Sequence, residues 1–127
     1  MKIKQVCALT GLTARTVRFY CERGLIHPAV YEQNDRNYYE YSQEDVRILR
    51  RLGTLRRAEF SLEEISCMMQ DEKSTGAIIL SHMQKLRERE VRTEQLLHKM
   101  QTLCENTPVD FAAFADALED NALPEDN

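Results

Sequence analysis

The chain has 127 residues, of which 43% are hydrophobic and 30% are charged, so its length suits one domain with an appendage. It has no run of the roughly 18 apolar residues that a membrane helix needs. Its first four residues precede mixed polar sequence rather than the apolar stretch of a signal peptide. The composition therefore predicts a cytoplasmic protein that has no membrane partner.

The charge is divided unequally along the chain. The net charge is −4, yet residues 1–57 hold 11 Lys and Arg against 6 Asp and Glu, whereas residues 58–127 hold 6 against 15. Because neutralisation of a phosphate backbone is local, this asymmetry matters more than the total. The basic half suits a nucleic-acid partner, and the acidic half does not.

The sequence lacks the patterns of a metal site or an enzyme. The four cysteines are far apart and form no Cys-x-x-Cys pair, which argues against a zinc finger and a disulfide framework. The three histidines are isolated. There is no Gly-rich phosphate loop, nucleophile elbow or cluster of acids and bases. We therefore expect no enzyme, no metal ligands and no cofactor. The residues concerned are Cys7, Cys21, Cys67, Cys104, His27, His82 and His98.

The N-terminal segment predicts two short helices at about residues 3–23. The first spans about Ile3–Leu9, and a tight turn containing Gly11 follows it. Thr13 is a plausible N-cap for a second helix that ends near Arg23, because Gly24 stops it. Two short helices joined by a Gly-containing turn are typical of a helix-turn-helix. In the second helix Val17 faces the core, with Tyr20 or Cys21 beside it, and the outward positions are Arg15, Thr16 and Arg18.

The next segment predicts a hairpin and two capped helices. Strand-favouring residues flank a turn signal at residues 33–35, so residues 29–41 form a small β-hairpin. A helix is expected from Ser42 to about Arg57, because an acidic residue stands three positions after the serine. Ser61 and Glu64 form a capping box for a short helix that ends at about Met68 or Met69.

The C-terminal part predicts one long helix and one short helix. After a polar break at residues 71–76, residues 77–104 contain no Gly or Pro. A helix of this length is long for a globular domain and suits a dimer. Its seam residues are Ile79, Met83, Leu86, Glu90, Thr93, Leu97, Met100 and Cys104. A short helix follows at 107–119 with an apolar stripe at Phe111, Phe114 and Leu118, and residues 120–127 form an acidic tail.

Five motifs occur in the order of a known family: IKQV at residues 3–6, LTGLTARTVRFY at 9–20, ERGLIHP at 22–28, YSQEDV at 41–46 and FSLEEI at 60–65. In this order they closely resemble the MerR family of bacterial transcription regulators over about residues 1–70. The resemblance implies a mainly α fold. An N-terminal winged helix-turn-helix at 1–71 precedes a dimerisation helix at 76–105 that forms an antiparallel coiled coil. It also implies a homodimer that binds and distorts a pseudo-palindromic promoter element, with RNA polymerase as a further partner.

The resemblance implies the site residues as well. Carried over by position, the recognition helix contributes Thr13, Arg15, Thr16, Arg18 and Tyr20. The hairpin wing contributes Arg36 and Tyr38. From the third helix, Arg50 and Arg57 are candidate phosphate contacts, and a solvated helix face is the equal alternative for each. The expected dimer contacts are Ile79, Met83, Leu86, Thr93, Leu97, Met100 and Cys104.

The chain departs from the family pattern in three places. The wing reads NYYEY at residues 37–41 where the family has Gly-Tyr-Arg-x-Tyr, so Tyr39 replaces the usual arginine. The usual Leu-Gly-Phe reads Ala58-Glu59-Phe60. Metal sensors of the family carry paired cysteines after the long helix, whereas here Cys104 has no second cysteine after it. The effector stays unknown, and Cys104 as a redox or metal sensor is the minor alternative to a packed thiol.

A different class of function remains as the competing hypothesis. In it the long and short C-terminal helices dimerise and the N-terminal half binds protein instead of DNA. The excess of cations in residues 1–57 argues against that interpretation.

Overall fold

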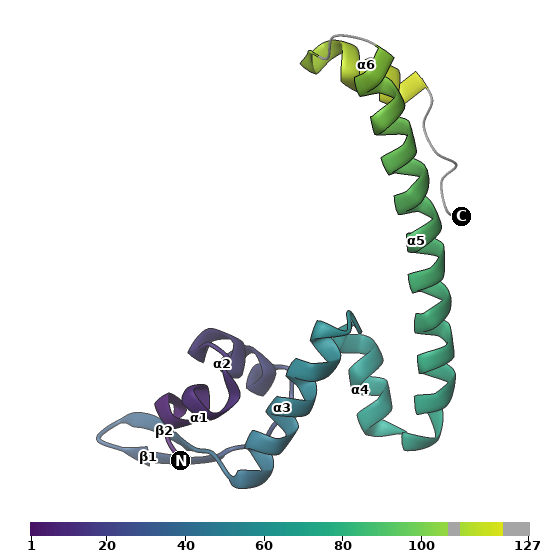
Figure 1. Cartoon of the computed structure of the whole chain (residues 1–127). Helices are drawn as coiled ribbons and strands as arrows, with labels where there is room; N and C mark the ends of the chain where they lie inside the picture. Colours follow the sequence, from purple (N-terminus) through teal and green to yellow (C-terminus); the bar gives the residue numbers. More distant parts are fainter. Residues whose placement is uncertain (107–109, 121–127) are drawn as a thin grey trace. The chain divides into compact units, whose positions relative to one another are not determined.

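The computed structural model describes residues 1–106 and 110–120 and divides into two compact units, Met1–Thr75 and Gly76–Asn127. Figure 1 shows the elements in chain order. The first unit holds α1 (Ile3–Thr10), α2 (Ala14–Glu22), β1 (Ala29–Gln33), β2 (Arg36–Glu40), α3 (Gln43–Arg57), α4 (Leu62–Gln70) and the 3-10 turn η1 (Glu72–Ser74). The helix α5 spans Thr75–Asn106, and α6 spans Phe111–Asp120. The expected mainly helical fold with one small hairpin is confirmed.

The helix-turn-helix forms where the sequence predicts it. Gly11, with φ of 75°, takes the left-handed conformation that ends α1, and its N–H donates to the Cys7 carbonyl at 2.9 Å. The Thr13 hydroxyl accepts from the Thr16 N–H at 3.1 Å and caps α2. A capping bond of this kind contributes about 1 kcal/mol to helix stability. These two local interactions fix the start of the second helix.

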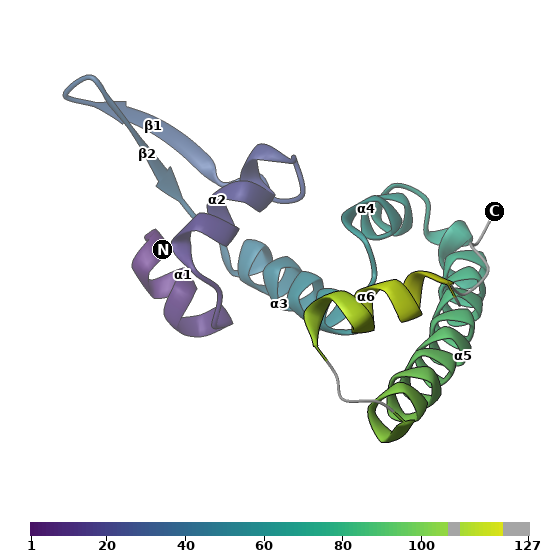
Figure 2. The same ribbon diagram turned by 90° about the horizontal axis from the view of Figure 1, so that it is seen from above.

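The hairpin is antiparallel, and its register runs from Ala29 opposite Glu40 to Gln33 opposite Arg36. Asn34 and Asp35 form the two-residue turn, with φ of 53° and 61°. Positive φ at both positions matches the twist of the strands, and Asn and Asp tolerate it better than most residues. Figure 2 shows the hairpin projecting past α1 and α2. The predicted wing is therefore present.

Both helices after the hairpin begin with a complete capping box. Ser42 and Asp45 exchange side-chain-to-backbone bonds at the start of α3, and Ser61 and Glu64 do the same for α4. Between these helices Glu59 has φ of 72°. Glu59 therefore adopts a left-handed backbone at the position where the resembled pattern has glycine, and that backbone is strained for a residue with a Cβ.

The core of the first unit joins α1, α2, α3 and α4. Its fully buried side chains are Val6, Val17, Ile26, Leu49, Leu52 and Ile65. Tyr20 is 5% exposed and belongs to this core. Tyr20, a predicted DNA contact, lies three residues after Val17 on the inward side of α2. The recognition helix is held by this packing.

The second unit contains α5 and α6. The long helix begins at Thr75, two residues before the predicted start, and includes Gly76 in its first turn. First-turn residues make few bonds within the helix, so glycine disrupts the helix little there. The expected short helix is observed from Phe111, and the Lys99 ammonium donates to the Leu118 carbonyl at 3.3 Å. Asp120, the first residue of the expected tail at 120–127, ends α6, and residues 107–109 and 121–127 lie outside the described residues. Among those described, no helix is long and apolar enough to cross a membrane.

Candidate nucleic-acid interface

The first turns of α2 present two arginines to solvent. Arg15 and Arg18 are exposed, and Thr13 is exposed beside them. Thr16 is half-buried, and its hydroxyl lies 2.9 Å from the Thr13 hydroxyl. The first turn of α2 holds no acidic residue, so the partial positive charge of the helix N-terminus is not neutralised there. This end of α2 suits an anionic partner.

A cleft separates α2 from the hairpin. It has a volume of about 110 Å³ and is lined by Arg18, Cys21, Glu22, Tyr39 and Tyr41. Burial raises the pKa of the Tyr41 hydroxyl and of the Cys21 thiol. The residue that replaces the usual wing arginine therefore lies next to the recognition helix. Tyr39 is 42% exposed, so part of the residue is accessible to a partner.

The opposite face of the hairpin is organised around Lys2. The rings of Tyr31 and Tyr38 stack at 5.5 Å, and the Lys2 ammonium lies 4.6 Å from the centre of the Tyr31 ring. The same ammonium bonds the Tyr31 hydroxyl and lies 3.0 Å from a Glu40 carboxylate oxygen. Hydrogen bonds to Tyr31 and Glu40 raise the pKa of Lys2. Tyr38, a predicted contact, is half-buried by this arrangement.

The Glu40 carboxylate, which stands next to Tyr39, is neutralised by two cations of the same chain. It accepts from the Met1 ammonium at 2.6 Å as well as from Lys2. These bonds, that of the Met1 ammonium first, lower the pKa of Glu40. The Tyr41 N–H also donates to the Met1 carbonyl at 2.8 Å, which extends the hairpin base. Two cations of the chain therefore offset the charge of Glu40, and no local pattern revealed these partners, because they are 38 and 39 residues away.

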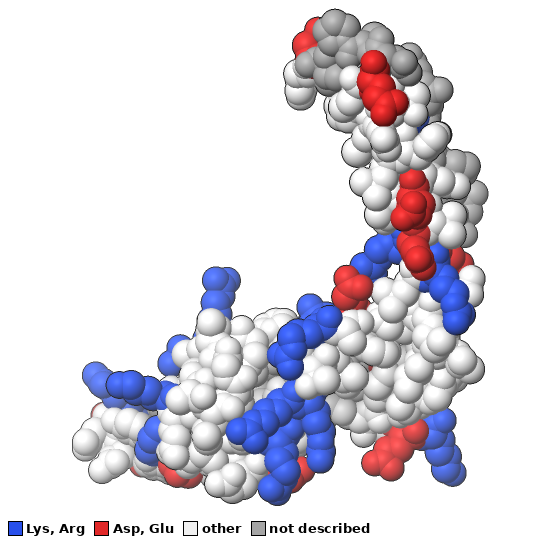
Figure 3. Space-filling view, in the orientation of Figure 1, with Lys and Arg blue, Asp and Glu red and all other residues white. Residues whose placement is uncertain are grey.

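The arginines of α3 differ in what they contact. The Arg50 guanidinium donates to the Leu9 carbonyl at 3.3 and 3.1 Å, and Arg56 donates to the Phe60 carbonyl at 2.8 Å. Arg57 is exposed and lies 3.5 Å from the Thr54 hydroxyl. Arg36, at the tip of the hairpin, is exposed. On the face drawn in Figure 3, Lys and Arg side chains gather over the N-terminal unit.

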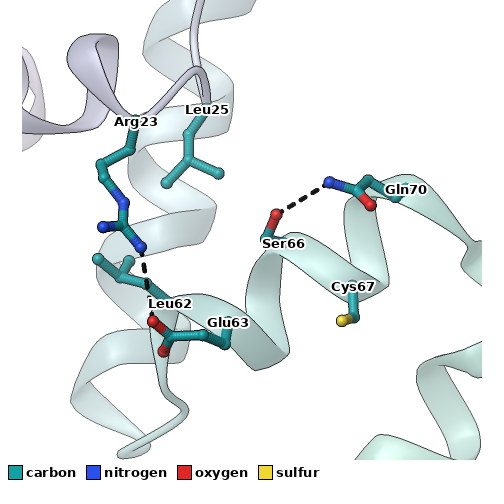
Figure 4. A pocket seen from close by; sticks show the side chains of 7 residues that line it. All are labelled: Arg23, Leu25, Leu62, Glu63, Ser66, Cys67 and Gln70. Atoms are coloured by element: carbon teal, nitrogen blue, oxygen red, sulfur yellow. Dashed lines mark hydrogen bonds and ion pairs between the residues drawn. The ribbon is translucent and has the colours of Figure 1, made fainter.

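A second pocket in the N-terminal unit is lined by one cation and one carboxylate, whose charges offset each other. It has a volume of about 260 Å³ and lies between the end of α2 and α4. Figure 4 shows the Arg23 guanidinium reaching the Glu63 carboxylate, at 3.5 Å, and the Gln70 amide donating to the Ser66 hydroxyl at 3.2 Å. Its cation and carboxylate bind each other, so the pocket offers little attraction to a phosphate. The other lining residues are Leu25, Leu62 and Cys67.

Comparison with known proteins decides the family. The MerR HTH family of regulatory proteins matches residues 1–72, which is more than half of the chain. The chain belongs to the MerR family. It is 35% identical over 88 residues to the HTH-type transcriptional regulator CueR of Vibrio cholerae, a match that covers 67% of this chain and 62% of CueR. It is 40% identical over 74 residues to the HTH-type transcriptional regulator YfmP of Bacillus subtilis, covering 58% and 51%.

Solved structures of the family share the fold. PbrR691 from Ralstonia metallidurans CH34, solved in complex with lead(II), superposes with a TM-score of 0.74 over 87% of this chain and 90% of its own, at 20% identity. A putative MerR-family regulator from Listeria monocytogenes gives a TM-score of 0.53 over 95% and 96%, at 21% identity. This chain spans about three fifths of the length of CueR of Vibrio cholerae. The family resemblance found in the sequence is therefore confirmed.

Within residues 1–106 and 110–120, no three or more His, Cys, Asp and Glu side chains are grouped to hold a metal ion. Cys104 is exposed near the end of α5, and Cys67 is exposed on α4.

The long helix presents a wider apolar face than the sequence predicted. Ile79, Met83 and Leu97 are 41%, 38% and 57% exposed. Leu80 and Val91, absent from the expected seam, are 68% and 57% exposed. They are eleven residues apart, which is close to three helical turns, so they share one line along the helix beside the predicted seam. Leu86 and Met100 are half-buried, and Thr93 and Cys104 are exposed. The seam predicted from alternating spacings of four and three residues leaves out Leu80 and Val91, because their eleven-residue spacing departs from that pattern.

Proposed function

We propose that the chain is a transcription regulator that binds a pseudo-palindromic promoter element as a homodimer and distorts it. The observation that carries the proposal is the pair of exposed arginines, Arg15 and Arg18, on a capped recognition helix in a MerR-family domain. The hairpin beside that helix carries Arg36 at its exposed tip. The excess of cations in residues 1–57 supports the same partner.

We propose different tasks for the helix and the hairpin. An α-helix fits the major groove of B-DNA, and residues near its N-terminal end reach base edges. We propose that Arg15 and Arg18 read bases from α2, with the hydroxyls of Thr13 and Thr16 beside them. Arg36 and the exposed Arg57 would bind phosphates, which position the helix but carry little sequence information.

The exposed face of α5 supports a homodimer. Isolated large apolar residues are common on protein surfaces, but several exposed large apolar residues along one long helix support an interface. We propose that residues 76–105 pair antiparallel with the same helix of a second chain. The expected contacts include Ile79, Met83 and Leu97 from the predicted seam, together with Leu80 and Val91. Two recognition helices related by a two-fold axis then match two half-sites.

The remaining assignments follow from the family. We propose residues 1–71 as the DNA-binding domain, RNA polymerase as a further partner, and a cytoplasmic protein without catalytic activity. The DNA half-site bound by each protomer would be deformed to fit the dimer. Such deformation of the DNA contributes specificity at base pairs that no side chain touches. The effector is left unassigned.

The substitution Arg18→Ala tests the proposal. The assay titrates the protein against a site selected from a random DNA pool by the wild-type chain, and against scrambled DNA. A lost base contact would weaken binding to the selected site by about 1–3 kcal/mol per half-site and change scrambled DNA much less. The matched control is Arg23→Ala, which removes the same charge at the other end of α2 where Glu63 binds it. Equal loss on both DNAs would assign Arg18 to a phosphate, and unchanged binding would exclude it from the interface.

A further inference from the structure

Arg50 connects α3 to the end of α1. Its Nε and Nη2 atoms donate to the Leu9 carbonyl oxygen at 3.3 and 3.1 Å. Carbonyls in the last turn of a helix have no partner inside that helix, and the partial negative charge of the helix gathers there. The last turn of α1 holds no basic residue of its own. Arg50 therefore supplies, from 41 residues away, the cation and the donors that α1 lacks.

The helix that carries Arg50, α3, is held in place by packing. Its neighbour Leu49 is fully buried, and Leu52 is 1% exposed, so the middle of α3 is fixed in the core. The fork of two donors on one oxygen also restricts the guanidinium more than a single bond would. Leu9 is thereby tied to a part of the molecule that packing holds in place.

The bonded carbonyl lies directly before the turn that orients the recognition helix. Four residues separate Leu9 from the start of α2 at Ala14. Within the turn, the Thr10 hydroxyl donates to the Val6 carbonyl at 2.8 Å and accepts from the Leu12 N–H at 3.2 Å. A shift of the end of α1 would therefore pass through a short, bonded turn to the first residues of α2.

We propose that Arg50 is a positioning residue that sets the sequence specificity of DNA binding by holding this turn, and that it is not a phosphate contact. The inference rests on the proposed function, because it concerns the same interface. The Arg50 guanidinium would then keep its bond to the Leu9 carbonyl oxygen in the DNA complex as well as in the free protein. Specificity then depends on Arg50 although the side chain touches no base.

Salt titrations separate positioning from phosphate contact. In Arg50→Ala we expect the ratio of affinities for the selected site and scrambled DNA to fall by about tenfold per half-site, the effect of one charge-assisted bond. We expect the slope of log K against log salt to stay unchanged. Loss of a phosphate contact would instead reduce that slope by about 0.9 per half-site, or about 1.8 for a dimer. A reduced slope, or an unchanged ratio, would overturn the inference.

Two further variants complete the test. Arg47→Ala is the matched control, because Arg47 stands on the same helix and binds Glu44 of that helix at 2.8 Å. It should leave the affinity ratio unchanged. Arg50→Lys retains one cationic donor and should restore part of the ratio. A ratio no higher in Arg50→Lys than in Arg50→Ala would contradict the role of the carbonyl bond.

Amide hydrogen exchange tests the inference without DNA. The Thr16 N–H donates to the Thr13 hydroxyl, so its exchange reports the first turn of α2. We expect that amide to exchange severalfold faster in Arg50→Ala than in Arg47→Ala. If the wild-type chain binds no DNA, the proposed function fails, and the exchange rates still decide whether Arg50 holds the turn. Equal rates in the two variants would show that it does not.

Discussion

Tyr39→Arg would restore the arginine that the family carries in its wing. Tyr39 lines the cleft between α2 and the hairpin, and 42% of the residue is exposed. A tyrosine hydroxyl can bond a phosphate, but it releases no counterion. A guanidinium at this position adds a cation beside Arg18, and Glu22 is the carboxylate in the same cleft. We expect tighter binding to any DNA sequence, because a phosphate contact does not depend on the bases.

The size of the effect follows from counterion release. One added phosphate contact per half-site steepens the slope of log K against log salt by about 0.9, and a dimer with two half-sites by about 1.8. Between 0.1 and 0.3 M salt, the advantage of the variant over the wild type should therefore shrink by roughly sevenfold. This change exceeds the error of a fluorescence anisotropy titration on labelled DNA.

Two further variants separate a phosphate contact at residue 39 from a general effect of added charge. Val30 lies opposite Tyr39 in the hairpin and is 57% exposed, so Val30→Arg adds the same charge to the neighbouring strand. It should steepen the slope less than Tyr39→Arg if the contact is specific to the position. Glu22→Gln in the Tyr39→Arg background prevents capture of the new arginine by that carboxylate. An unchanged slope in this double variant would refute the placement of the hairpin along the DNA backbone.

Three other outcomes are expected. Glu59→Gly should raise the free energy of unfolding by about 0.5–1 kcal/mol in urea titrations, because Glu59 has φ of 72°; a loss would contradict strain at this turn. Leu97→Asp should give a monomer in sedimentation, because it buries an unpaired charge in the dimer, and an unchanged dimer would remove Leu97 from the interface. Burial raises the pKa of the Cys21 thiol, so less thiolate forms there. Iodoacetamide at pH 8 should therefore label the exposed Cys67 faster than Cys21, as followed by mass spectrometry. Equal labelling rates would contradict that burial.

The local elements could be predicted because their signals are local. Thr13 caps α2 within three residues, and Ser42 and Ser61 begin their helices with boxes of the same span. The Asn34-Asp35 turn fixes the register of the hairpin. Such interactions depend on neighbours in the sequence, so pattern and spacing suffice to predict them.

The contacts that organise the site join distant residues, and the sequence did not reveal them. Arg50 and Leu9 are 41 residues apart, and the sequence left Arg50 undecided between a phosphate contact and a solvated face. Glu40 stands next to Tyr39, and its bonds to the Met1 ammonium and to Lys2 join residues 38 or 39 positions apart. Tyr20 fits the family motif by position, yet packing turns it into the core. Each of these outcomes depends on which distant segments of the chain pack together, which no local pattern encodes.

The central claim, a homodimer that reads DNA sequence, is tested most directly by selection from a random DNA pool with the wild-type chain, followed by titration of the enriched site. We predict a pseudo-palindromic site with two half-sites, bound by two chains about a thousandfold or more tighter than scrambled DNA at physiological salt. A pool that enriches no sequence, or equal affinity for enriched and scrambled DNA, would contradict the account.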